Sequence, residues 1–330
     1  MIKDNLSFFE TIKKSGTVAV LGVPIDLGKD TSGTHKGPEV LRKVGIASVL
    51  KDIGFGVNDL GDVECPIREQ AEIGDLKLKY LESIVRISET VAKNVSAELK
   101  KKNKVLVLGG DNTVSLGSLA GAAEALGENL GVIWIDAHGD INTHETTMSG
   151  NIHGMPIAAA LGLGEERLVN LNFKGRKIKP ENLVYVGLKD LDQAEIDIIR
   201  EKNISFVTML DISEQGLASA FEKIRDLAKR VSSVWVCLDV DSIDKEYAPA
   251  TPMATGGGLN YRESLYLAKF IGKVCEVSGV DVSEFAPDLD NKNKTATLVV
   301  ELVANYFGGD YSWYTRYMEE ERKKQTKRRG

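Results

Sequence analysis

Eight short stretches of the chain are rich in aliphatic and β-branched residues, and most of them are nearly continuous apolar runs. They cover residues 17–23, 105–108, 132–135, 183–188, 204–209, 234–240 and 277–282, with a weaker stretch near 55–60. A strand that is apolar at every position is covered on both faces, as it is in a parallel sheet between two layers of helices. This pattern restricts the chain to α/β architectures.

Helical patterns with apolar residues spaced near 3.6 positions separate these runs. They cover residues 77–102, 113–126, 215–230, 261–271 and 294–307. The alternation of strand and helix continues to the end of the chain, with no linker rich in Pro, Ser or Gly. We therefore predict one domain over residues 1–330, a three-layer α/β/α fold with a mostly parallel central sheet of about eight strands.

Composition excludes several classes of function. The chain has 42 Lys and Arg against 48 Asp and Glu, a formal net charge of -6, which argues against general nucleic-acid binding. No apolar run approaches the ~20 residues that span a bilayer, and no signal peptide is visible, so we expect no membrane partner and a cytoplasmic protein. Three widely spaced cysteines, Cys65, Cys237 and Cys275, fit free thiols in a reducing compartment.

The exception to this charge balance is the charged end of the chain, residues 319–330. Six of the eight residues from 322 to 329 are Lys or Arg. Such a run is either a solvated, frayed tail or the last turns of a helix, or else an interaction tail. The first interpretation is the simpler one.

Polar side chains follow the ends of four predicted strands. These segments are Gly109-Gly-Asp-Asn112, Asp136-Ala-His-Gly-Asp140, Asp239-Val-Asp241 and Ser283-Glu284. Ligands of open parallel sheets bind beyond the carboxyl ends of the strands. We therefore expect a dense set of carboxylates and a histidine in one cleft.

The spacing within two of these segments indicates a metal site. Side chains at alternate positions of an extended segment point the same way, so Asp136, His138 and Asp140 can project together, as can Asp239 and Asp241. Unpaired carboxylates crowded in an apolar cleft repel one another, and divalent cations remove that cost. Mixed carboxylate and imidazole ligands suit Mn²⁺ or a similar ion. The alternative, that these acids are turn residues and helix caps, explains one aspartate more easily than both segments.

Three segments together resemble the signatures of the ureohydrolase family, which includes arginases, agmatinases and related guanidino-group hydrolases. They are Asp136-Ala-His-Gly-Asp140, Ser149-Gly-Asn-Ile-His153-Gly154 and Asp239-Val-Asp-Ser-Ile-Asp244. The similarity extends from Gly22-Val-Pro-Ile-Asp26 to Asp281-Val-Ser-Glu284, and so covers most of the chain. It implies an arginase-like fold and a homotrimer or homohexamer.

The resemblance also implies a binuclear site with two Mn²⁺ ions per subunit. Its ligands would be Asn112, Asp136, His138, Asp140, Asp239 and Asp241. The family usually has histidine where this chain has Asn112. An amide oxygen is a poorer donor than imidazole for most divalent transition metals, so we expect one of the two ions to bind weakly.

The activity that the resemblance implies is hydrolysis of the guanidinium group of L-arginine to L-ornithine and urea by a metal-bridging hydroxide. His153 matches the histidine that shuttles protons in the family, and Glu284 matches the acid that binds the guanidinium. Asp140 would both ligate metal and accept a hydrogen bond from the tetrahedral intermediate. Two other histidines, His35 and His144, have no comparable support.

Five further residues match positions that hold the amino-acid end of L-arginine in arginases. Asn142, Thr147 and Ser149 correspond to those that bind the α-carboxylate, and Asp192 and Glu195 to those that contact the α-ammonium. Agmatine lacks this carboxylate, so the set favours an arginase over an agmatinase. The simpler interpretation of Asp192 and Glu195 is that they cap and begin a helix.

Two departures from the family pattern leave alternatives open. Asn112 changes a metal ligand, and Met253 stands where arginases usually have threonine, so one hydroxyl that lines the guanidinium pocket is missing. The alternatives are an agmatinase or another guanidino hydrolase, and a non-catalytic arginase-like protein.

Overall fold

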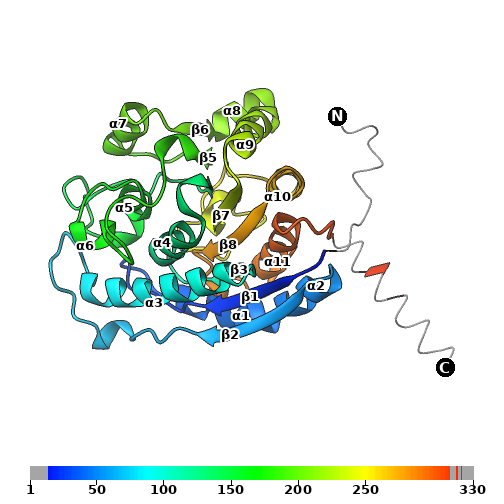
Figure 1. The fold of residues 1–330 in the computed structure, drawn as a ribbon, viewed down its shortest axis with the longest axis horizontal. Helices are drawn as coiled ribbons and strands as arrows, with labels where there is room; N and C mark the ends of the chain where they lie inside the picture. The colour runs from blue at the N-terminus through cyan, green and yellow to red at the C-terminus, as the bar shows by residue number, and fades with distance from the viewer. Residues whose placement is uncertain (1–13, 313–316, 319–320, 322–330) are drawn as a thin grey trace.

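The computed structural model describes residues 14–312, 317, 318 and 321, and within them one sheet of eight strands forms the centre of the fold (Figure 1). The strand order is β2-β1-β3-β8-β7-β4-β5-β6, and every neighbouring pair is parallel. The strands are β1 (Thr17–Gly22), β2 (Gly56–Asp62), β3 (Lys104–Leu108), β4 (Leu130–Ile135), β5 (Leu183–Leu188), β6 (Ser205–Thr208), β7 (Ser233–Asp239) and β8 (Val277–Ser283). The eight predicted strands and the three-layer architecture are confirmed.

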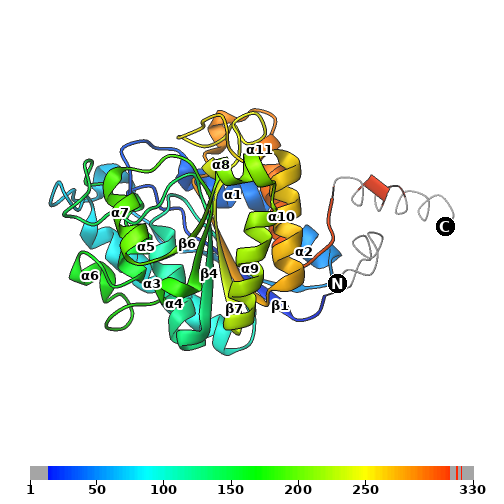
Figure 2. The same cartoon turned by 90° about the horizontal axis from the view of Figure 1, so that it is seen from above.

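Helices cover both faces of this sheet, which Figure 2 shows edge-on. One face carries α1 (Gly37–Lys43), α2 (Ile46–Asp52), α8 (Met209–Gln215), α9 (Ala218–Arg230), α10 (Tyr261–Val274) and α11 (Lys294–Tyr306). The other face carries α3 (Leu81–Lys100), α4 (Val114–Leu126), α5 (Pro156–Ala160), α6 (Glu166–Val169) and α7 (Gln193–Glu201). None of the helices in the described part of the chain is long and apolar enough to cross a membrane.

Alternation along each strand divides the buried apolar residues into two cores. In β3, Leu106 and Leu108 pack into the core beneath α10 and α11, whereas Val105 and Val107 pack into the core beneath α3 and α4. Successive side chains of a strand point to opposite faces, so a strand between two helical layers must be apolar at every position. The continuous apolar runs of the sequence have this cause.

The direction in which successive strands are added changes at the centre of the sheet. The consecutive strands β3 and β4 are not neighbours, because β8 and β7 return late in the sequence to fill the space between them. The loops after β3 and β4 therefore leave in different directions, and this reversal of strand order creates a crevice at the carboxyl ends. Any ligand site of this sheet is expected there.

Local signals explain where the predicted boundaries were wrong. The stretch 204–209 was predicted as strand throughout, but Thr208 caps a helix and Met209 begins it, with Asp211 completing a capping box. The helix predicted over 77–102 begins only at Leu81, because Tyr80 has the left-handed backbone angle φ 60°. In the described part of the chain, six helices were not revealed by the 3.6-residue period, because they are nine residues long or shorter and too short to show it clearly.

Two smaller predictions concern the cysteines and the C-terminal end of the chain. Cys65, Cys237 and Cys275 are free thiols in the structure, as predicted. The charged tail predicted over 319–330 lies outside the described residues except for Glu321.

Close packing of β7 against β8 gives a test of the fold. A Cβ added at Gly279 would lie 2.1 Å from the ring of Trp235, whose indole N–H is held by Asp281 at 2.7 Å. We expect Gly279→Ala to lower the free energy of unfolding by about 1–3 kcal/mol, the cost of overpacking a core. Urea denaturation of both proteins measures the change.

The matched control is Gly56→Ala on the edge strand β2. The nearest atom to an added Cβ there is 3.4 Å away, an ordinary contact. This control should change stability by less than about 0.5 kcal/mol. Equal effects of the two substitutions would show that the Gly279–Trp235 contact does not limit the packing.

Candidate active site

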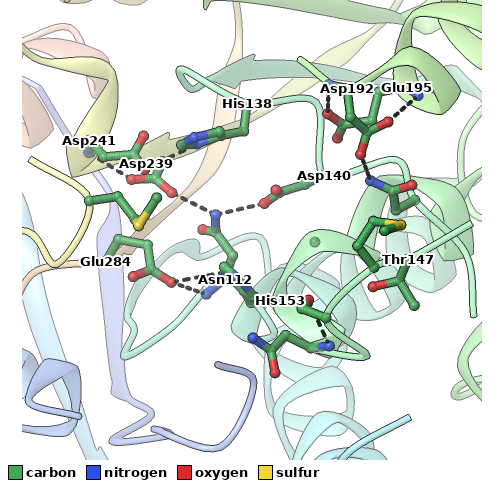
Figure 3. A pocket seen from close by; sticks show the side chains of 16 residues that line it. Asn112, His138, Asp140, Thr147, His153, Asp192, Glu195, Asp239, Asp241 and Glu284 are labelled. Carbon is green, nitrogen blue, oxygen red and sulfur yellow. Dashed lines mark hydrogen bonds and ion pairs between the residues drawn. The ribbon is translucent and has the colours of Figure 1, made fainter. Parts of the chain in front are cut away.

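The predicted site residues meet at the carboxyl ends of the four central strands. Asn112 follows β3, Glu284 follows β8, Asp239 ends β7 and Asp136 follows β4. All the predicted residues except the fully buried Asp136 line one cavity of about 270 Å³ (Figure 3). The cavity is therefore in the crevice that the strand order creates.

Three of these residues form a group with the geometry of a metal site. The ligand atoms of Asp136, His138 and Asp241 all lie within 4.8 Å of one another. Nδ1 of His138 is 3.2 Å from Asp241 and 3.4 Å from Asp136. Oδ1 of Asp241 is buried and has no hydrogen-bond partner. A buried carboxylate oxygen without a donor is rare, and a cation would satisfy it.

Short-range hydrogen bonds set the direction of two of the carboxylates. Oδ1 of Asp136 accepts the backbone N–H of His138 at 2.7 Å, and Oδ1 of Asp239 accepts that of Asp241 at 2.7 Å. Trp134 donates its indole N–H to the second oxygen of Asp136 at 2.9 Å. In each of these two turns, the backbone N–H two residues further along holds the aspartate side chain in one orientation.

The side-chain amide of Asn112 donates hydrogen bonds to carboxylates of the same cluster. Its Nδ2 lies 2.6 Å from Asp239, 2.7 Å from Asp140 and 3.4 Å from Asp136. Its Oδ1 accepts a hydrogen bond from the hydroxyl of Ser283. The amide thus turns its nitrogen toward the carboxylates, and to ligate a metal it would have to turn its oxygen there instead.

Crowding shifts the pKa values of this cluster upward. Burial raises the pKa of Asp136 to about 7, and the charge of Asp241 adds to the shift. Burial, followed by the charges of neighbouring carboxylates, also raises the pKa values of Asp140 and Asp239 well above the usual range. Burial opposes protonation of His138, but its hydrogen bonds and charge interactions with Asp136 and Asp241 outweigh it and raise the imidazole pKa. Burial and crowding therefore make Asp136, Asp140 and Asp239 bind protons more tightly than exposed carboxylates do.

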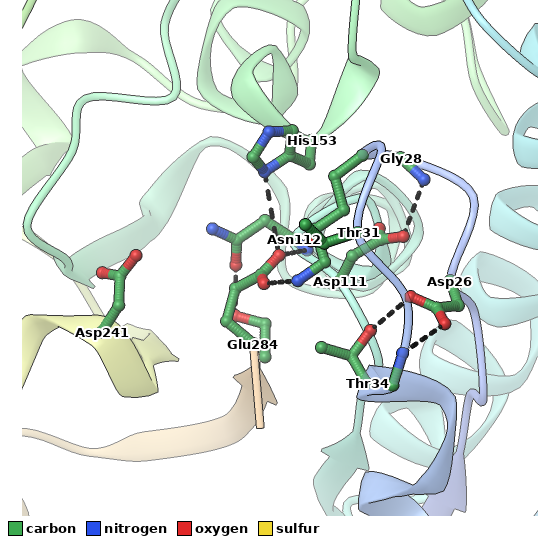
Figure 4. A network of polar contacts seen from close by, with 12 residues as sticks. Asp26, Gly28, Thr31, Thr34, Asp111, Asn112, His153, Asp241 and Glu284 are labelled. Atoms are coloured by element: carbon green, nitrogen blue, oxygen red, sulfur yellow. Dashed lines mark hydrogen bonds and ion pairs between the residues drawn. The ribbon is translucent and has the colours of Figure 1, made fainter. Parts of the chain in front are cut away.

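Glu284 follows β8, lines the same cavity and is only 2% exposed. Its Oε1 accepts the backbone N–H of Asn112 at 3.1 Å and lies 3.8 Å from Nδ1 of His153 (Figure 4). Its Oε2 forms an ion pair with Lys29. Burial alone would raise the pKa of Glu284, but the charge of Lys29 and the contacts with Lys29 and His153 lower it to about 2. Glu284 is therefore an anion in the folded protein.

The outer wall of the cavity carries the residues predicted to hold an amino acid. Asn142, Thr147 and Ser149 lie on the loop after β4, and Asp192 and Glu195 lie at the start of α7. Asp192 and Glu195 form a capping box, in which each side chain accepts the other's backbone N–H. The helix-cap interpretation of this pair is thus correct. Both residues also line the cavity. Oδ2 of Asp192 accepts a further hydrogen bond from the side chain of Asn142 at 2.7 Å.

The sequence did not indicate Lys29, and it gave no role to Ser283, which was named only as part of a polar segment at a strand end. Lys29 pairs with Glu284 across 255 positions, and Ser283 orients the amide of Asn112. No spacing rule links residues so far apart, so nothing in the sequence indicates the Lys29 contact. Met253, noted as a departure, does line the cavity and is half exposed.

The sequence and the fold of this chain are similar to those of known proteins. The sequence profile of the Arginase family matches residues 16–308. The arginase of Bacillus subtilis (strain 168) is 40% identical over 292 residues, which are 88% of this chain and 98% of that protein.

The chain belongs to the arginase family.

Solved structures agree with this membership. The arginase of Bacillus caldovelox superposes with a TM-score of 0.86 at 38% identity, covering 90% of this chain and 99% of that one. The formimidoylglutamase of Bacillus subtilis superposes with a TM-score of 0.70 at 24% identity, and shows the fold alone. The eight-stranded sheet with helices on both faces is therefore an arginase-family fold.

The raised pKa of Asp136 gives a pH-dependent test of the cluster in the presence of EDTA. The carboxyl titrates near 3.8 when unfolded and near 7 when folded, so its contribution to stability is present below about pH 4 and is lost as pH rises through about 7. In Asp136→Asn this titration is absent. The free energy of unfolding of the parent minus that of the variant should fall by roughly 1 kcal/mol or more from about pH 5 to about pH 8.

Chemical denaturation of both proteins at several pH values measures this difference. The asparagine can still accept the indole N–H of Trp134 through its amide oxygen, so the comparison removes mainly the titrating group. A difference that stays flat or rises with pH would contradict the raised pKa.

Proposed function

We propose that this chain hydrolyses the guanidinium group of L-arginine to L-ornithine and urea, with Mn²⁺ as its metal. The observation that carries the proposal is the single cavity in which the acidic cluster, His153, Glu284 and a polar outer wall face one another. The match to the Arginase family and to proteins named arginase supports the same reaction. The reaction class is that of a C–N hydrolase acting on linear amidines.

The donor set fits one divalent ion as it stands. Asp136, His138 and Asp241 converge, Asp239 lies beside them, and the partnerless Oδ1 of Asp241 fits a cation ligand. A second ion would be held by Asp140 and Asn112, with Asp136 and Asp239 shared, once the Asn112 amide turned its oxygen inward. Bound metal supplies the nucleophile, because divalent charge lowers the pKa of water into the neutral range.

The chain's own residues would then bind the substrate and manage its protons. Glu284, anionic and facing the cavity, would pair with the planar guanidinium, whose N–H groups match a carboxylate. Asp140 would accept a hydrogen bond from the substrate's guanidinium group as the guanidinium carbon becomes tetrahedral. When the bond from that carbon to the chain nitrogen breaks, His153 would deliver a proton to this nitrogen, which becomes the side-chain amine of L-ornithine. The His153 side chain is 28% exposed, so it can exchange protons with solvent.

The outer wall would hold the amino-acid end of the substrate. Asn142, Thr147 and Ser149 offer amide and hydroxyl donors to an α-carboxylate, while Asp192 and Glu195 offer carboxylates to an α-ammonium. Burial raises the pKa of Glu195, so an incoming ammonium would favour its charged form. This division of donors and acceptors favours L-arginine over agmatine.

The position of Asn112 favours a second candidate, a non-catalytic arginase-like protein. Its amide nitrogen already donates to Asp140 and Asp239, two of the carboxylates that would hold a second ion. A cytoplasmic location, and a trimer or hexamer, remain proposals that rest on the family.

The first test is urea release from L-arginine and from agmatine after the protein is warmed with Mn²⁺. We expect urea from L-arginine, little from agmatine, and none from Asp136→Ala, which removes a ligand of both ions. Urea mainly from agmatine would favour the agmatinase alternative. No urea from either compound would favour the non-catalytic candidate.

The second test replaces Asn112 with histidine. Because imidazole is a better donor than an amide for Mn²⁺, Asn112→His should lower the Mn²⁺ concentration for half-maximal urea release by about tenfold or more. Calorimetric titration of the same protein with Mn²⁺ should show a tighter second site.

Asn151→His is the matched control, since Asn151 lines the same cavity outside the proposed ligand set. Its Mn²⁺ requirement should equal that of the parent. An unchanged requirement in Asn112→His would show that this position does not hold metal.

A further inference from the structure

A buried lysine is paired with the carboxylate that would receive the guanidinium. The side chains of Lys29 and Glu284 are 4% and 3% exposed, and Nζ of Lys29 donates a hydrogen bond to Oε2 of Glu284 within an ion pair. Lys29 is not among the residues that line the cavity, so its ammonium reaches Glu284 from behind the cavity wall. Within the described part of the chain, this is the most deeply buried lysine ion pair with a glutamate.

The residue before Lys29 is held by hydrogen bonds through both of its backbone polar groups. The N–H of Gly28 donates to Asp111 at 2.7 Å, and its carbonyl accepts the backbone N–H of His153 at 3.1 Å (Figure 4). A Cβ at Gly28 would lie 2.5 Å from Thr113, so the loop is packed against the start of α4 without free space. Lys29 therefore extends from a closely packed and hydrogen-bonded position of the loop toward Glu284.

Both oxygens of Glu284 are already engaged. Oε2 faces Lys29, while Oε1 accepts the backbone N–H of Asn112 and lies near His153. A guanidinium binds a carboxylate best through two parallel N–H contacts to both oxygens of an unshared anion. A cationic substrate would here meet a carboxylate whose charge is balanced by a protein ammonium.

We propose that Lys29 is a specificity-determining residue, whose ammonium acts as a built-in cation at Glu284 and weakens binding of guanidinium ligands relative to neutral ligands of the same shape. The proposal rests on the proposed function only in taking the Glu284 wall as the place where the reacting end of a ligand binds. Repulsion between two cations at one carboxylate is its physical basis. It concerns affinity, and Lys29 itself need not contact the reacting atoms.

Two ligands that differ in one charge test this proposal. L-arginine ends in a cationic guanidinium, whereas L-citrulline ends in a neutral ureido group of nearly the same shape. Calorimetric titrations of the full-length chain in EDTA, where no turnover occurs, give the dissociation constant of each. Lys29→Met and Lys29→Gln should each bind L-arginine about tenfold or more tightly than the parent does, with L-citrulline changed by less than about twofold.

Lys269→Met is the matched control. Lys269 forms an ion pair with Asp310, with side chains 8% and 11% exposed, on α10 rather than in the loop after β1. Its removal deletes a comparably buried ammonium and should leave both dissociation constants unchanged. Lys29→Gln keeps a donor toward Glu284, so it provides the test if Lys29→Met fails to fold.

The outcomes separate this proposal from the proposed function. A selective gain for L-arginine supports the role of Lys29, even if no protein in the series releases urea. Equal changes for both ligands, no change, or weaker binding of L-arginine would overturn it, even if the parent releases urea normally. In the last case Lys29 would serve to position Glu284.

Discussion

Repulsion among carboxylates at one edge of the sheet is the constraint on which this site depends. Asp136, Asp140, Asp239, Asp241 and Glu284 are each at most 5% exposed. Ionised carboxylates buried together are unstable unless donors or cations offset them. Several contacts of the cavity wall offset this cost.

The protein supplies part of that compensation from its own side chains. The amide of Asn112 donates to three aspartates, the imidazole of His138 lies between two, and the ammonium of Lys29 neutralises Glu284. Oδ1 of Asp241 alone among the carboxylate oxygens of this cluster is buried without a hydrogen-bond partner. One half of the cluster is thus prepared for a cation, while the other is already satisfied by N–H groups. Backbone strain adds to this cost, because Asp140 (φ 47°) and Glu284 (φ 60°) lie in the left-handed region.

More of the fold than of the site could be predicted from the sequence. Buried parallel strands leave a strong signal, because each must be apolar on both faces, and all eight were found. Asp136, His138, Asp239 and Asp241 could be located because short-range spacing places them on strand ends. The contacts of Lys29 and Ser283 could not, because they depend on how distant loops pack. The direction of the Asn112 amide is likewise decided by its neighbours, and the residue type permits either.

The parallel sheet has a consequence for how this protein acquires its site. No hairpin joins neighbouring strands, and β8, which carries Glu284, pairs with β3 and β7. The hydrogen bond between Asn112 and Glu284 joins residues 172 positions apart. Contacts of such sequence separation form slowly, because much chain entropy is lost before they stabilise anything. During synthesis, Asn112, Asp136 and Asp140 would emerge before Asp239, Asp241 and Glu284, and β7 and β8 must enter between β3 and β4, so the cavity can form only after β8 has left the ribosome.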